Sequence, residues 1–202
     1  MEFLHKIASY TPVPAGGAAV ANSFCLAVAL IYKVVLFESE RNLHTGEPGS
    51  NLMQFKKEIE KLLKDAERVV DADSEAYMQF AQSRRNGNTV LMNQHFNEII
   101  EISMSVMEKS EVAFEWIRQL RDVIPQQMVT HLLVASELLM GSINGTVHII
   151  RENLKSLKAS EKRENYLKRL NDLHNEYRNR YKEIMDSFPL EPEALNAGNG
   201  QT

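Results

Sequence analysis

The 202-residue chain (23.0 kDa) has 44% hydrophobic and 25% charged residues, which is typical of a folded globular protein of one domain or two small ones. This composition excludes disorder over the whole chain, and a single cysteine, Cys25, excludes a disulfide scaffold or a cysteine-based zinc site. The net charge of −4 gives no electrostatic reason to expect nucleic acid or an anionic membrane as a partner. The N-terminus lacks the pattern of a signal peptide, so we expect a cytoplasmic protein.

Apolar residues recur at helical spacing along the chain, and no segment alternates apolar and polar residues as a half-buried strand does. The spacing predicts six helices, over residues 2–10, 16–43, 50–85, 89–123, 125–158 and 160–188. Residues 189–202 have no periodicity and predict a frayed tail. We therefore predict an all-α, single-domain bundle over residues 1–188.

The second predicted helix, residues 16–43, is the most apolar. Its residues 18–37 are long enough to span a membrane, but Asn22, Ser23 and Lys33 interrupt them. A helix that is apolar all round is also typical of the centre of a bundle. We therefore expect this helix to be the buried core helix, with no membrane involved.

The sixth predicted helix has large apolar side chains at steps of three or four residues. This spacing predicts a seam that packs in the core or against a second copy of the chain. Its members are Tyr166, Leu170, Leu173, Tyr177, Tyr181, Ile184 and Phe188.

The first candidate site is the turn into the second helix, where residues 12–19 read Pro-Val-Pro-Ala-Gly-Gly-Ala-Ala. Glycines at a helix start leave backbone N–H groups accessible, and the helix dipole favours negative charge there. Small residues at this position also suit a tight helix–helix contact. The residues alone leave both interpretations open.

The second candidate is Asp73, which falls on the apolar stripe of the third helix between Val70 and Tyr77. A carboxylate aimed at a core is costly unless it is hydrogen-bonded. Burial would also raise its pKa, as general acid–base catalysis near neutral pH requires. A structural hydrogen bond to a neighbouring helix end is the alternative, and from the residues alone it is slightly favoured.

The third candidate is a row of small residues on the fifth helix. Such a row suits close helix packing better than it suits a slot for a planar ligand. Its members are Ala135, Ser136, Gly141, Ser142, Gly145 and Thr146. The six histidines show no metal-ligand spacing, so no metal site is expected.

With these motifs the sequence resembles the cyclodeaminase/cyclohydrolase family of folate one-carbon metabolism. The family's Pro-x-Pro-Gly-Gly-Gly-Ser turn is matched by residues 11–18, and its Asp-x-x-Ala-Tyr/Phe motif by residues 73–77. An Asn-Leu pair before a Lys-rich turn is matched by residues 153–155, and the order of motifs agrees over about residues 1–185.

The resemblance implies an all-α fold, usually a homodimer, with Asp73 as proton donor and acceptor. It implies a tetrahydrofolate derivative as substrate with no further cofactor, and a lyase or hydrolase activity. The residues it implies for substrate binding are Pro14, Gly16, Gly17, Arg41, Tyr77 and Asn153.

Several family positions are changed in this chain. Ala15 and Ala18 replace a glycine and a serine, and Glu38 and Glu40 stand where the family has threonine and glycine. Residues 83–86 replace a Leu-Pro-Lys element, and the family's Gly-Asn and Ser-Asp positions fall on residues 124–125 and 130–131. A folate enzyme and a non-catalytic, dimeric ligand-binding or interaction module are therefore both open. A structural helical protein outside the family is a third alternative.

Overall fold

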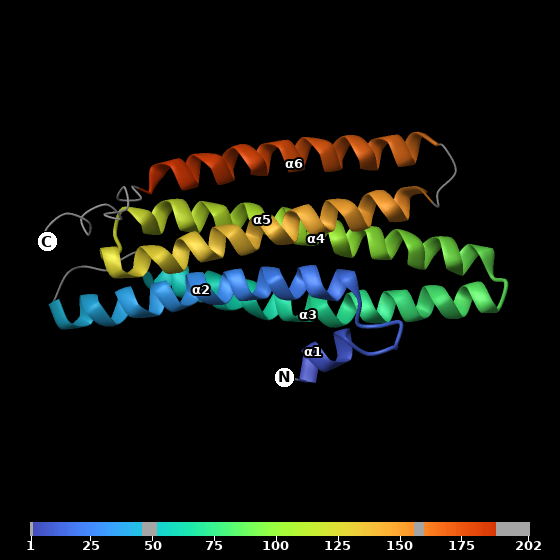
Figure 1. Cartoon of the computed structure of the whole chain (residues 1–202), viewed down its shortest axis with the longest axis horizontal. Coiled ribbons are helices and arrows are strands. Elements are labelled where there is room, and N and C mark those ends of the chain that lie inside the picture. The colour runs from blue at the N-terminus through green and yellow to red at the C-terminus, as the bar shows by residue number, and fades with distance from the viewer. Residues whose placement is uncertain (1, 46–51, 156–159, 189–202) are drawn as a thin grey trace, which may run out of the picture.

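The computed structural model describes residues 2–45, 52–155 and 160–188, and all regular elements in these ranges are α-helices (Figure 1). The prediction of an all-α fold with six helices is confirmed. The helices are α1 (Glu2–Ile7), α2 (Gly16–Thr45), α3 (Leu52–Arg85), α4 (Thr89–Arg121), α5 (Gln126–Lys155) and α6 (Glu161–Ser187). The predicted start of the third helix at Ser50, the predicted end of the fifth helix at Lys158 and the predicted tail 189–202 lie outside the described residues.

Three predicted helix ends are wrong by two or three residues. The second helix continues to Thr45 instead of ending at Leu43. The first helix stops at Ile7 instead of Tyr10, because the Ser9 hydroxyl donates to Lys6 O at 2.7 Å and closes the last turn. The fourth helix stops at Arg121 instead of Val123, because the N–H groups of Val123 and Ile124 both donate to Leu120 O at 3.1 Å.

The connection between α3 and α4 is a tight turn. Gly87 has φ of +66°, a left-handed conformation that glycine adopts without strain. Asn88 then caps α4, since its Oδ1 accepts a hydrogen bond from Leu91 N at 3.1 Å. Ser160 caps α6 in the same way, with its Oγ accepting from Arg163 N at 3.3 Å.

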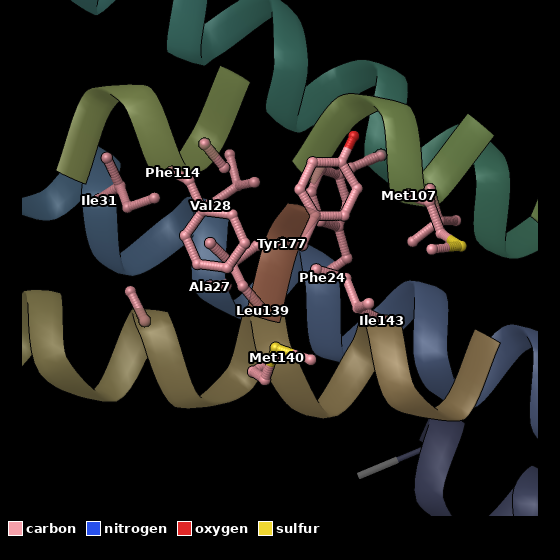
Figure 2. Close-up of a cluster of buried hydrophobic side chains, with 14 of the residues drawn as sticks. Phe24, Ala27, Val28, Ile31, Met107, Phe114, Leu139, Met140, Ile143 and Tyr177 are labelled. Carbon is pink, nitrogen blue, oxygen red and sulfur yellow. The ribbon is translucent and has the colours of Figure 1, made fainter. Parts of the chain in front are cut away.

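The helices α2 to α5 lie side by side in an elongated bundle, and α6 runs along α4 and α5 (Figure 1). Helix α2 packs most extensively against α3 and α5, whereas α1 stands apart from the bundle. The core contains side chains of α2, α4, α5 and α6 (Figure 2). The rings of Phe114 and Tyr177 pack there with their centroids 6.2 Å apart.

The predicted seam of α6 is a core contact. Five of its members are buried in the single chain, and Leu173 and Tyr181 pack against the core from its edge. The buried members are Tyr166, Leu170, Tyr177, Ile184 and Phe188.

Helices α2 and α5 are in very close contact. The Ser142 hydroxyl of α5 donates to Val20 O at 2.7 Å, and the Ser23 hydroxyl of α2 donates to Leu138 O at 3.1 Å. A Cβ atom at Gly145 would overlap Cγ1 of Val20. The small residues of α5 therefore serve packing. Gly141 is an exception, because it is exposed and has open space where a Cβ would lie.

Helix α2 has two different faces in the single chain. One face is completely buried and includes Phe24, Val28 and Ile31. The opposite face leaves Leu26 and Phe37 exposed, at 51% and 37% of their surface. Both α2 and α5 are long and apolar enough to span a membrane, a property that core helices of soluble bundles share.

Candidate functional site

Asp73 lies against the first turn of α2. It is 9% exposed on α3, and its carboxylate faces the α-carbon of Gly17 so closely that a Cβ at position 17 would overlap both carboxylate oxygens. The backbone N–H of Ala18 also hydrogen-bonds with this carboxylate. Gly17 therefore makes room for the acid at the end of the helix where backbone N–H groups have no helical partner.

Two opposing effects act on the Asp73 carboxyl. Burial raises its pKa above the usual 3.8, because desolvation disfavours the ionised form. The Ala18 N–H lowers the pKa by stabilising the carboxylate, and burial is the larger effect. Asp73 is thus an acid that holds its proton more tightly than an exposed aspartate and has a built-in donor for its ionised form.

The Asp73 carboxylate opens onto a pocket of about 270 Å³. Four segments form its walls: residues 13–17, the C-terminal part of α3, the start of α4 and the end of α5. One wall is aromatic, with the rings of Phe80 and Phe96 tilted at 50° and their centroids 5.8 Å apart. The lining residues are Val13, Ala15, Gly16, Gly17, Asp73, Tyr77, Phe80, Phe96, Ile99, Ile149, Glu152 and Asn153.

The structure brings together most of the residues that the sequence singled out. Gly16, Gly17, Asp73, Tyr77 and Asn153 all line the pocket. Pro14 follows a cis Val13–Pro14 peptide bond and lies between two lining residues.

The position of Tyr77 differs from the expected apolar stripe. Its side chain is 41% exposed, so it stands at the edge of the pocket and not in the core. Ala76, its neighbour on α3, is buried instead. The apolar stripe predicted the helix correctly, but its assignment of Tyr77 to the buried face is wrong.

Arg41 is not brought to this pocket. Twenty-four residues of α2 separate it from Gly17, or about 36 Å at 1.5 Å per residue. There its Nε donates to Oε2 of Glu38 at 2.9 Å, and Glu38 is 2% exposed. The glutamate that departs from the family pattern is therefore neutralised by the neighbouring arginine.

Five lining residues were not expected from the sequence. Phe80 had a usable signal, because it is seven residues from Asp73 and so lies on the same face of α3. Glu152 is adjacent to the expected Asn153. Phe96, Ile99 and Ile149 had no such signal, since only the packing of α4 and α5 brings them here. No group of three or more metal-ligating side chains occurs in the described ranges.

These features define an all-α bundle protein with a pocket built around one buried carboxylate at a helix N-terminus. The chain belongs to the formiminotransferase-cyclodeaminase family, whose model matches residues 1–172. The resemblance inferred from the sequence motifs is thereby confirmed.

The fold is similar to that of a solved cyclodeaminase. The crystal structure of formiminotetrahydrofolate cyclodeaminase from Thermotoga maritima superposes with a TM-score of 0.81 and covers 92% of each chain. The two sequences are 17% identical, so this likeness establishes the fold. No curated protein sequence matches the chain significantly.

Proposed function

We propose that this protein is a cytoplasmic folate one-carbon enzyme of the formiminotetrahydrofolate cyclodeaminase or methenyltetrahydrofolate cyclohydrolase type. The observation that carries the proposal is the Asp73 carboxyl, which is buried, has a raised pKa and faces a pocket shared with Gly17 and Asn153. Membership of the family supports the substrate class.

Asp73 would act as proton donor and acceptor. In the deaminase direction, a folate nitrogen attacks the formimino carbon, and the departing nitrogen must gain a proton to leave as ammonia. In the hydrolase direction, water adds to the methenyl carbon and must lose a proton. A carboxyl with a raised pKa supplies the first proton, and its ionised form accepts the second. The ionised form also stabilises the positive charge of the methenyl bridge.

The shape of the pocket suits a flat, partly apolar group. Its volume of about 270 Å³ is close to the lower limit for small-molecule pockets, so it would hold the reacting ring system while the rest of a folate lies outside. Phe80 and Phe96 supply apolar surface for such a ring, and Asp73 and Asn153 supply polar groups.

A homodimer accompanies this proposal. The outer face of α2 carries exposed Leu26 and Phe37 on the most apolar helix of the chain, and Leu43 is 83% exposed near its end. Apolar surface of this kind is typical of an interaction site. A second copy of the chain, placed on this face, would cover it.

A non-catalytic ligand-binding module is the second candidate. One observation favours it: no lysine or arginine lines the pocket in the part of the chain that the structure describes, and the expected Arg41 is paired with Glu38 far away. The carboxylates of a folate's glutamate tail would then have to pair with basic side chains outside this pocket.

The test is turnover of formimino- and methenyltetrahydrofolate by the purified protein, with Asp73→Asn and Asp71→Asn beside it. Asp71 is on the same helix but exposed, so it controls for a change of charge. We expect wild-type turnover that falls 100-fold or more in Asp73→Asn, the usual scale of acid–base catalysis, and stays unchanged in Asp71→Asn.

Other outcomes separate the candidates. Folate binding without turnover by the folded wild type would favour the binding module. Neither turnover nor binding would contradict both candidates.

A further inference from the structure

Helix α6 is flanked by two grooves that differ in their charge. The first lies between α4 and α6 and has a volume of about 550 Å³. Its three arginines, Arg118, Arg121 and Arg180, are all ion-paired: Arg118 with Glu115 at 2.6 Å, Arg121 with Asp122 at 2.7 Å and Arg180 with Glu176 at 2.7 Å. This groove is therefore internally neutralised.

The second groove lies between α5 and α6 and has a volume of about 790 Å³. It contains two basic side chains, Arg178 and Lys182, and neither has an ion pair among the described residues. Its one carboxylate, Glu137, already accepts a hydrogen bond from the Tyr181 hydroxyl at 2.6 Å. Basic groups thus outnumber acidic ones here, in a chain whose net charge is −4.

His174, which also lines this groove, has several basic neighbours. Its pKa is lowered first by burial and then by three basic neighbours: Arg178, Arg151 and His148. Its Nε2 lies 2.9 Å from Oδ1 of Asn144, a further lining residue. Basic and hydrogen-bonding side chains therefore occur together at the α5–α6 groove.

We propose that the α5–α6 groove binds a small multivalent oxyanion, of phosphate or polycarboxylate chemistry. Arg178 and Lys182 would hold the anion by charge-assisted hydrogen bonds, which are the stronger kind because the donors carry full charges. The amides of Asn175 and Asn179, which also line the groove, would donate to its remaining oxygens.

This site is separate from the Asp73 pocket. Asn144 lines the groove and Asn153 lines the pocket, and both are on α5. Nine residues at about 100° each place them on opposite sides of the helix. The inference therefore does not depend on the proposed folate chemistry.

The test is calorimetric titration of the full chain with pyrophosphate and, separately, with citrate. We expect saturable binding that weakens at least tenfold in the double variant R178Q/K182Q. The matched control is R118Q/R121Q, which removes the same charge from the neutralised α4–α6 groove and should leave binding within twofold. Tighter binding of pyrophosphate or of citrate would distinguish the phosphate from the carboxylate source. Asp73→Asn should bind the anions as the wild type does, whatever its turnover.

A second readout is the imidazole NMR titration of His174. Its charged and titratable neighbours are Glu137, His148 and Arg151 on α5 and Arg178, Tyr181 and Lys182 on α6. A bound anion would offset the basic ones, so saturating pyrophosphate should raise the pKa of His174 in the wild type but not in R178Q/K182Q. The proposal would be overturned if neither pyrophosphate nor citrate binds at 10 mM, or if both double variants weaken binding equally.

Discussion

The α-carbon of Gly17 and the carboxylate of Asp73 are in direct contact, and no space remains between them for a β-carbon. Gly16, one residue earlier, is different. A Cβ there would meet only the side chain of Ile149, with Cδ1 at an ordinary 3.8 Å and Cγ1 at 4.0 Å. Of the two adjacent glycines, Gly17 is thus the one that the position of the buried acid requires.

Gly17→Ala is expected to lower the free energy of unfolding by about 1–3 kcal/mol, the usual cost of overpacking. The better helix propensity of alanine, worth up to about 1 kcal/mol, offsets only part of this cost. Gly16→Ala should stay within about 1 kcal/mol of the wild type. Urea denaturation of the two variants measures the difference, and equal stabilities would show that Asp73 moves aside at little cost.

The raised pKa of Asp73 makes its contribution to stability depend on pH. Below the unfolded value of about 3.8 the carboxyl is protonated in both states, so its ionisation costs nothing. As the pH rises above 3.8, the unfolded state loses the proton first, and the free energy of unfolding falls until the folded pKa is passed. Asp73→Asn has no ionisable group at this position, so its free energy of unfolding does not fall for this reason.

The stability of Asp73→Asn relative to wild type should therefore increase with pH above 3.8 and then level off. Denaturation curves between pH 3.5 and 7 measure it, with Asp71→Asn as the exposed control. If the stability of Asp73→Asn instead decreases relative to wild type as the pH rises, the hydrogen bond from Ala18 outweighs burial.

Leu26→Glu is expected to dissociate the proposed homodimer, because it puts a charge on the exposed apolar face of α2. The control is Val112→Glu on α4, where the wild-type side chain is 43% exposed. Light scattering after size exclusion should give a dimer for the wild type and for Val112→Glu, and a monomer for Leu26→Glu. A monomeric wild type at micromolar concentration would contradict the dimer itself.

Gly145→Ala and Gly141→Ala should have opposite effects on stability. The first would push into Val20, whose β-branched side chain has little rotamer freedom in a helix, so we expect a loss of about 1–3 kcal/mol. The second fills open space on a helix and should gain up to about 1 kcal/mol. Thermal unfolding of both variants checks the pair; a stabilised Gly145→Ala would mean that α2 and α5 can separate without penalty.

The two buried tyrosines of α6 should respond differently to removal of the hydroxyl group. Tyr177 is fully buried, and its hydroxyl has no hydrogen-bond partner among the described residues, so Tyr177→Phe should leave stability unchanged or raise it by about 1 kcal/mol. The Tyr166 hydroxyl donates to Glu101 Oε1 at 2.7 Å, so Tyr166→Phe should lose about 1 kcal/mol. Denaturant midpoints measure both, and a clear loss in Tyr177→Phe would reveal a partner such as a buried water.

Most of the fold could be predicted because helices are local. The 3.6-residue spacing depends only on neighbours in the sequence, and it located all six helices. The ends were less predictable, because one or two local hydrogen bonds, at the Ser9 hydroxyl and at the Leu120 carbonyl, stop their helices. Spacing does not encode such details.

The site was predictable only in part, for a tertiary reason. The Gly16–Gly17 turn and Asp73 were separate candidates in the sequence, and the antiparallel packing of α2 on α3 joins them. The aromatic wall of the pocket also includes Phe96 of α4, and no local sequence pattern indicates that Phe96 lies beside Phe80. Arg41 was expected in the site but lies far from it. Its position in the sequence does not show that it is near the other end of the 30-residue helix α2 from the pocket.

The two serine hydroxyls that cross between α2 and α5 have a mechanical consequence. Together with Gly145 against Val20, they hold the N-terminal part of α2 against the middle of α5. Gly17 and Asn153 belong to these two helices, whereas Asp73, Phe80 and Phe96 belong to the α3–α4 hairpin. The contacts between α2 and α5 therefore fix the spacing between Gly17 and Asn153, on the side of the pocket that faces Asp73, Phe80 and Phe96.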